Sequence, residues 1–145
     1  MTEIAFHFNA GDKLAYTCRL LRKAVARGAQ VVVAAEPSAL QQLDGALWTF
    51  GAQEFLPHCP ANADPAVLLN SPVVLTGSPS DAPHQQVLVN LTDGVPDGFE
   101  RFERLIEVVS GDAQDRQAAR ARWKHYADRG YAMVHHDLMQ TGSVE

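Results

Sequence analysis

The sequence predicts an α/β protein, a three-layer sandwich in which helices cover both faces of a mainly parallel β-sheet. The first 35 residues have the pattern strand, helix, strand, and a unit of that length normally joins parallel strands. Two further apolar runs, Val73–Thr76 and Val87–Leu91, are typical of strands buried on both faces. A chain of 145 residues fits one domain, which we expect over residues 1–140, with a flexible tail at 141–145.

The opening strand–helix–strand unit is clearly patterned. Residues 4–8 alternate between apolar and other side chains and predict the first strand. A helix is expected from Asp12, which is placed to cap it, to Arg27, with Gly28 ending it. Its apolar residues form one stripe: Leu14, Cys18, Leu21 and Val25. The second strand follows at Val31–Ala35.

The middle of the chain is less regular. A second helix is expected from Pro37 or Ser38 to Leu47, with Leu40, Leu43 and Leu47 facing the core. Residues 48–57 then form a short, turn-rich stretch with three large apolar side chains: Trp48, Phe50 and Phe55. Residues 58–71 are predicted to be a loop, and residues 77–83 a linker between the two later strands.

Two more helices are predicted toward the C-terminus. A turn at residues 92–98 precedes apolar residues with helical spacing, which predict an amphipathic helix: Phe99, Phe102, Leu105, Ile106 and Val109. Residues 110–112 break this pattern, and the last helix is expected from about Ala113 to Arg129.

Composition narrows the class of protein. A net charge of −5 disfavours general binding to a phosphate backbone. Two cysteines, Cys18 and Cys59, do not form a disulfide framework and indicate free thiols in a reducing cytosol. We expect neither a signal peptide nor a membrane span, because the N-terminus is not basic and no apolar run reaches 18 residues.

The chain carries no recognisable catalytic or cofactor motif. The first strand–helix loop has a single glycine, Gly11, too few for a dinucleotide fingerprint, and there is no phosphate-binding GxxxxGK[ST] sequence. The adjacent pairs His58–Cys59 and His135–His136 lack zinc spacing and are interpreted as solvated loop residues. No GxSxG elbow is present, and Cys18 is expected to be a buried hydrophobe. We therefore expect no cofactor, no metal and no catalytic activity.

The most distinctive segment is the basic helix at residues 113–130. It holds five basic and two acidic residues, a local charge of about +3. Ala119, Trp123 and Tyr126 share one face at helical spacing. The cations Arg116, Arg120 and Lys124 lie beside that face, and Arg122 and Arg129 flank its other side. Such a surface suits an extended ligand that carries apolar side chains and carboxylates.

Two other interpretations of this helix stay open from the residues alone. Trp123 and Tyr126 are also consistent with core residues that pack the helix on the sheet, with the arginines as a solvated face, and for an arbitrary helix this interpretation is favoured. Nucleic acid is a third possibility, because basic and aromatic residues also bind and stack bases, although the acidic remainder of the chain disfavours it.

The chain resembles the chi subunit of bacterial DNA polymerase III, a clamp-loader accessory protein. The resemblance is carried by Arg120–Tyr131 (RARWKHYADRGY), by Leu43–Trp48 (LDGALW) with Phe55–His58 (FLPH), and by Gly98–Val109 (GFERFERLIEVV). It extends from Phe6 to about Tyr131. It implies a Rossmann-like fold, no catalytic activity and two protein partners.

The resemblance assigns a surface to each partner. One surface binds the psi subunit, which links chi to the clamp loader, and the matching positions are Trp48 and Phe55, with Leu47 and Leu56 as neighbours. The other binds the acidic C-terminal tail of single-stranded DNA-binding protein. Its matching positions are Arg120 and Lys124 for carboxylates and Trp123 for the apolar pocket, with Arg116, Tyr131 and Met133 nearby. The large apolar residues at 48–55 could instead form a local cluster that fixes the turn.

The predicted function is therefore that of a replisome adaptor. It would be a monomer within a heteromeric complex in the bacterial cytoplasm, joining the clamp loader to protein-coated single-stranded DNA without touching the DNA. The alternative is a nucleotide- or nucleic-acid-processing enzyme on the same fold.

Overall fold

The computed structural model describes residues 1–49 and 57–141. Its centre is a seven-stranded sheet with the order β3-β4-β2-β5-β6-β1-β7, and every neighbouring pair is parallel. The strands are β1 (Glu3–Ala10), β2 (Val31–Ala34), β3 (His58–Pro60), β4 (Val73–Thr76), β5 (Val87–Asn90), β6 (Arg104–Ser110) and β7 (Met133–Asp137). The predicted three-layer, Rossmann-like α/β sandwich is confirmed, and the sheet is wholly rather than mainly parallel.

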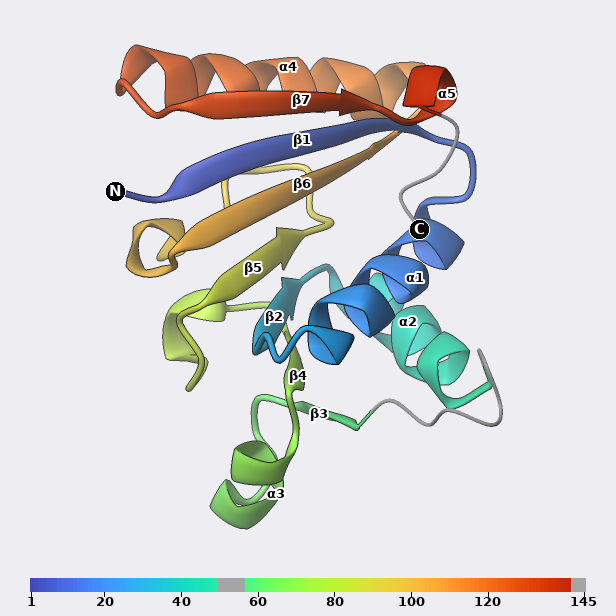
Figure 1. The fold of residues 1–145 in the computed structure, drawn as a ribbon, viewed down its shortest axis with the longest axis vertical. Coiled ribbons are helices and arrows are strands. Elements are labelled where there is room, and N and C mark those ends of the chain that lie inside the picture. Colours follow the sequence, from blue (N-terminus) through green and yellow to red (C-terminus); the bar gives the residue numbers. More distant parts are fainter. Residues whose placement is uncertain (50–56, 142–145) are drawn as a thin grey trace.

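The helices divide between the two faces of the sheet. The helices are α1 (Lys13–Ala26), α2 (Pro37–Thr49), α3 (Pro65–Asn70), α4 (Ala113–Asp128) and α5 (Leu138–Thr141), with 3₁₀ turns η1 (Pro79–Asp81) and η2 (Phe99–Arg101). Side chains of α1, α2 and α5 pack in one core, and those of α3, α4 and η2 pack in the other. Figure 1 shows α4 beside β7 at one end of the molecule and α3 at the opposite end.

The first strand–helix–strand unit forms as predicted. The Asp12 carboxylate accepts a hydrogen bond from the Ala15 backbone N–H and caps α1. Gly28, with φ of 85°, ends it in the left-handed conformation that favours glycine. Cys18 and Leu21 of the predicted stripe are buried, and Leu14 and Val25 pack against them.

The predicted helix at residues 99–109 is wrong. Phe99 begins the short turn η2, and from Arg104 onward the stretch is strand β6, which pairs with both β5 and β1. A strand in the middle of a parallel sheet is covered on both faces, so neighbours such as Leu105 and Ile106 are both buried. The adjacent residues Leu105 and Ile106, together with Phe99 and Phe102, have a spacing that resembles that of a helix.

Three other predictions are corrected. Residues 58–71 are not one loop, because they contain β3 and α3; an edge strand of three residues and a helix of six are too short to show a period. Trp48 lies in the last turn of α2 rather than on an irregular stretch. His135 and His136 lie on β7 rather than in a loop, and His58 is buried on β3. Phe50, Phe55 and Leu56 lie outside the described residues.

Candidate functional site

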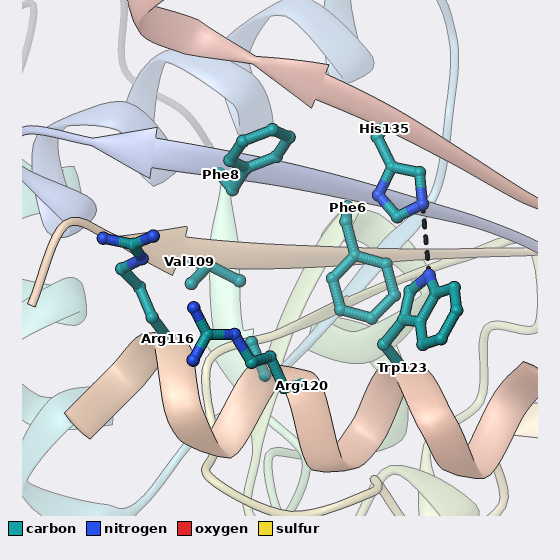
Figure 2. A pocket seen from close by; sticks show the side chains of 8 residues that line it. Phe6, Phe8, Val109, Arg116, Arg120, Trp123 and His135 are labelled. Atoms are coloured by element: carbon teal, nitrogen blue, oxygen red, sulfur yellow. Dashed lines mark hydrogen bonds between the residues drawn. The ribbon is translucent and has the colours of Figure 1, made fainter. Parts of the chain in front are cut away.

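A pocket of about 280 Å³ opens between α4 and the edge of the sheet. Arg116, Ala119, Arg120 and Trp123 contribute the α4 side, and Phe6, Phe8, Val109 and His135 contribute the strand side. Figure 2 shows both guanidinium groups at one end of the pocket and the Trp123 and His135 rings at the other. The lining is thus apolar and aromatic, with two cations and no carboxylate among the described residues.

The sheet register creates the strand side of this pocket. Phe6 and Phe8 are two residues apart on β1, so their side chains project from the same face. Phe6 pairs with His135 of β7, and the two rings are stacked with centroids 5.9 Å apart. On the other side of β1, Val109 comes from the end of β6. Three neighbouring strands therefore supply one continuous floor of apolar and aromatic side chains.

Trp123 closes the aromatic end of the pocket. Its indole N–H donates a hydrogen bond to Nε2 of His135 over 3.1 Å, as Figure 2 shows. That nitrogen accepts, so the ring proton of neutral His135 lies on Nδ1. Trp123 is 41% exposed, which leaves part of its ring free for a ligand. The hydrogen bond and the exposed ring surface together make Trp123 a fixed wall rather than a core residue.

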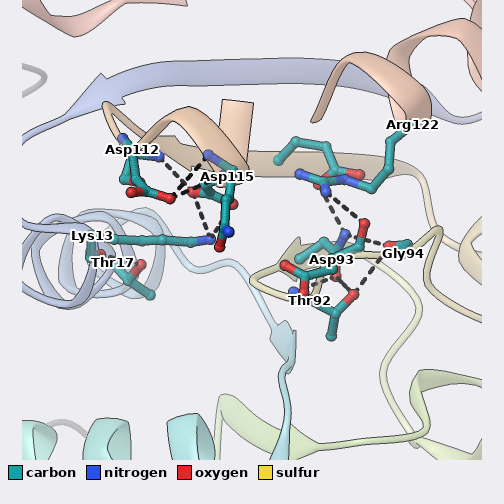
Figure 3. A network of polar contacts seen from close by, with 12 residues as sticks. Lys13, Thr17, Thr92, Asp93, Gly94, Asp112, Asp115 and Arg122 are labelled. Atoms are coloured by element: carbon teal, nitrogen blue, oxygen red, sulfur yellow. Dashed lines mark hydrogen bonds and ion pairs between the residues drawn. The ribbon is translucent and has the colours of Figure 1, made fainter. Parts of the chain in front are cut away.

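The helix α4 is held to the sheet by a buried charged group. Glu107 of β6 is fully buried and accepts hydrogen bonds from Arg122 Nε (3.0 Å), Tyr126 Oη (2.6 Å) and Asn90 Nδ2 (2.9 Å). Burial raises the pKa of Glu107, and the Arg122 charge and the three donors offset part of this effect. Burial and the neighbouring carboxylate also raise the pKa of Tyr126. Arg122 reaches onward to the Asp93 carbonyl in the turn after β5 (Figure 3).

The start of α4 is fixed by a second contact. Asp112 caps the helix by accepting from the backbone N–H groups of Gln114 and Asp115. Asp115 accepts from the Ser110 backbone N–H at 2.8 Å and forms an ion pair with Lys13 of α1 at 3.2 Å (Figure 3). Partial burial alone would raise the pKa of Asp115, but Ser110 and Lys13 lower it below its usual value. These bonds fix the first turn of α4, one residue before Arg116.

The structure separates the predicted residues of the basic helix into three groups. Arg116, Arg120 and Trp123 line the pocket together. Lys124 is exposed, lies outside the lining and is 3.9 Å from Asp128. Arg122, predicted to flank the helix as a surface cation, is instead buried with only 1% of its surface exposed. Helical spacing could not distinguish the buried Arg122 from the exposed arginines of the same helix. The carboxylate that pairs with Arg122 is that of Glu107, which lies on strand β6.

Tyr131 and Met133 lie beyond the pocket lining. Both are partly buried and pack against the core beneath α4, where the Tyr131 ring is 5.3 Å from that of Phe99. The sequence interpretation missed Phe6, Phe8, Val109 and His135. The alternate spacing of Phe6 and Phe8 was visible in the sequence. It indicates a pocket wall only when β1 is known to lie beside β7.

The second predicted surface is described in part. Trp48 is 60% exposed at the end of α2, and its ring lies 5.5 Å from that of His58, which is bonded to Asp44. Leu47 is 2% exposed and packs in the core, so it offers no surface for a partner. Phe55 and Leu56 lie outside the described residues.

The rest of the described chain shows neither a metal cluster nor a membrane helix. No group of three or more His, Cys, Asp or Glu side chains among residues 1–49 and 57–141 is placed to hold a metal ion. None of the helices in the same ranges is long and apolar enough to cross a membrane. Cys18 and Cys59 are buried and unbridged.

Comparison with known proteins identifies the relatives of the chain. The sequence model of the family described as DNA polymerase III chi subunit, HolC, matches residues 1–134. DNA polymerase III subunit chi of Pseudomonas aeruginosa is 33% identical over 143 residues, covering 95% of this chain and 98% of that protein.

Proposed function

The chain belongs to the DNA polymerase III chi subunit family, and from this premise we propose that it is a non-catalytic adaptor of the replisome. In this proposal the pocket under α4 binds the acidic C-terminal tail of single-stranded DNA-binding protein. The surface around Trp48 binds the psi subunit and, through it, the clamp loader. The adaptor would act in the bacterial cytoplasm as one subunit of a heteromeric complex, without contacting DNA directly.

The observation that carries the tail-binding proposal is the pairing of two guanidinium groups with an apolar, aromatic cavity. A free C-terminal carboxylate next to a large apolar side chain needs both features, because Arg binds carboxylates bidentately and the cavity removes apolar surface from water. Arg116 and Arg120 are one helical turn apart and border the floor formed by Phe6 and Phe8. Acidic residues earlier in the tail would also be attracted to the exposed ammonium of Lys124.

Calorimetry with a synthetic acidic peptide that ends in phenylalanine tests the site. Arg120→Ala should weaken binding about tenfold, which corresponds to about 1.4 kcal/mol. Arg116→Ala and Trp123→Ala should also weaken binding, and Lys124→Ala should weaken it less. Arg129→Ala is the matched control, because it removes an exposed cation from the C-terminal end of α4, outside the pocket lining.

The ligand itself provides a second control. Replacing the terminal carboxylate of the peptide with an amide should reduce binding as much as Arg120→Ala does. The amide should also have little further effect in the Arg120→Ala protein, because the two changes remove the same interaction. Equal binding of the acid and amide peptides would refute the assignment of the carboxylate to this pocket. Binding should weaken with added salt, because Arg116 and Arg120 are exposed.

The psi proposal rests on Trp48. A large aromatic side chain with 60% of its surface exposed is typical of an interface anchor. Trp48→Ala should abolish co-purification with psi while leaving the acidic peptide bound with unchanged affinity. Val67→Ala, which truncates an exposed apolar residue of α3, should affect neither partner. Loss of both ligands in folded Trp48→Ala protein would contradict two separate surfaces.

A further inference from the structure

A second cavity lies on the opposite face of the sheet, on the α1 side. It has a volume of about 370 Å³ and lies between the C-terminal half of α1 and the strands β5, β6, β1 and β7. On β1 and β7, this cavity is lined by His7 and His136, whereas the pocket under α4 is lined by Phe6 and His135. Adjacent residues on a strand point to opposite faces, so the two cavities are separated by the sheet itself.

Cationic side chains gather at one end of this cavity. Lys23 lies in the last turn of α1, Arg27 caps its C-terminus, and Arg104 is the first residue of β6. The helix α1 runs back from the end of β1 to the start of β2, so its C-terminal end lies at the amino ends of the strands. Arg27 and Arg104 therefore meet at the same end of the sheet. Glu103 is the one carboxylate among the lining residues.

The two guanidinium groups are available for a ligand. Among the residues that the structure describes, neither Arg27 nor Arg104 takes part in an ion pair. Lys23 already has an interaction partner, so its ammonium adds positive charge without being required as a direct contact. As in the pocket under α4, two arginines thus border one cavity without carboxylate partners in the described chain, although the protein has a net charge of −5.

The floor of the cavity is apolar and its far end carries imidazole rings. Leu20, Ala24 and Ile106 form part of the floor. His7 is buried, is hydrogen-bonded to Tyr16 and has its ring 4.8 Å from that of His136. Burial, with contributions from the charges of His136 and Arg104, lowers the pKa of His7 to about 4. The lining cations Lys23, Arg27 and Arg104 outnumber the single carboxylate, Glu103, which favours an anionic ligand.

From this arrangement we propose that the cavity binds a small phosphate-bearing anion, with its phosphates between Arg27 and Arg104. Guanidinium groups bind phosphate oxygens bidentately, and two of them can hold two successive phosphate groups. The volume falls in the usual range for small-molecule sites, about 300–1,000 Å³. The ligand chemistry is shared by nucleoside triphosphates and inorganic polyphosphates. A nucleotide would also place its base over the apolar floor.

Calorimetry with ATP and with inorganic triphosphate, both without metal ions, tests this site. Arg104→Ala and Arg27→Ala should each weaken binding at least tenfold, and Arg104→Lys should retain part of the affinity. Arg129→Ala provides the control for net charge. Equal affinity for both ligands assigns the site to the phosphate chain alone, whereas tighter binding of ATP assigns a role to the apolar floor; either result supports the proposal.

The acidic peptide distinguishes this site from the pocket under α4. Arg104→Ala should leave peptide affinity unchanged, and Arg120→Ala should leave triphosphate affinity unchanged. Absence of saturable binding of both phosphate ligands would overturn the proposal. It would also be overturned if Arg129→Ala weakened binding as much as Arg104→Ala, or if the peptide displaced the triphosphate. None of these results depends on whether the tail-binding proposal is correct.

Discussion

Replacing Arg122 with methionine should be among the most destabilising changes on α4. The side chain is 1% exposed, and its Nε donates to the Glu107 carboxylate at 3.0 Å. Methionine fills much of the same space but leaves Glu107 buried without its counter-charge. Removing one member of a buried ion pair typically costs about 3–5 kcal/mol, a large part of the roughly 5–15 kcal/mol that stabilises a domain. We expect the melting temperature to fall by on the order of 10 °C.

A second substitution separates charge from packing. In the double variant Arg122→Met/Glu107→Gln, the glutamine oxygen can still accept from Asn90, its amide N–H group can donate to the Tyr126 hydroxyl oxygen, and no charge is buried. Stability should recover by about 1–3 kcal/mol relative to Arg122→Met, as measured by urea unfolding followed by circular dichroism. Tyr126→Phe is a milder probe that removes one donor at 2.6 Å and should cost about 1.5–3 kcal/mol.

The pH dependence of the Arg122→Met variant provides the decisive check. Burial raises the pKa of Glu107 already in the native protein, and losing Arg122 removes an effect that lowers it. A carboxyl group whose folded pKa lies above its unfolded value binds more protons in the folded state, so stability rises as pH falls toward the unfolded pKa. The variant should therefore regain stability relative to the native protein as pH falls toward the ordinary pKa of a glutamate. Strictly additive substitutions with no such change in pH dependence would refute the view that Glu107 and Arg122 act as a charged pair.

Three further predictions test other parts of the fold. The folded pKa of His7, about 4, lies below its ordinary value of 6.5, so the unfolded chain binds the extra proton first as pH falls. The free energy of unfolding should therefore decrease by about 3 kcal/mol between pH 7 and pH 4. In urea titrations, the His7→Gln variant should show a smaller decrease. Burial raises the pKa of the Cys18 thiol, and Cys59 is also buried, so both should react slowly with a thiol reagent until urea is added; fast reaction of the native protein would contradict their burial. Gly98 has φ of 76°, and an added Cβ would lie 2.8 Å from the Ser80 Cβ, so Gly98→Ala should lower the melting temperature; Gly94→Ala, where a Cβ meets no atom within 4 Å, should have a smaller effect.

The sequence predicted those elements whose patterns are local. The first strand, α1 with its Asp12 cap, and the buried strands β2, β4 and β5 were all visible as apolar stripes or runs. The strand β6 was mistaken for a helix because a doubly covered strand shows no alternation, and the one polar residue in its interior, Glu107, is itself buried. A strand of three residues and a helix of six gave no period to detect.

The candidate site was predictable on one side only. Helical spacing brought Arg116, Arg120 and Trp123 together, because residues three or four positions apart share a helix face. The opposite wall comes from strands distant in the sequence, and only the order β6-β1-β7 makes Phe6, Val109 and His135 neighbours. The position of Arg122 also required the fold, since it is buried against a strand carboxylate that its own helix does not determine, whereas the core position of Leu47 was predicted from helical spacing.

The strand order also sets the distance between the two proposed partner surfaces. Trp48 contacts His58 on β3, the first strand of the sheet, and Trp123 contacts His135 on β7, the last. Six inter-strand spacings of about 4.8 Å separate these two strands, a distance of roughly 29 Å. If both proposed partners bind, they are held this far apart by a rigid spacer, and a pull between them is directed across the strands rather than along them. The hydrogen bonds between parallel strands would then carry the load, so the mechanical strength of the connection would depend on the sheet as much as on either interface.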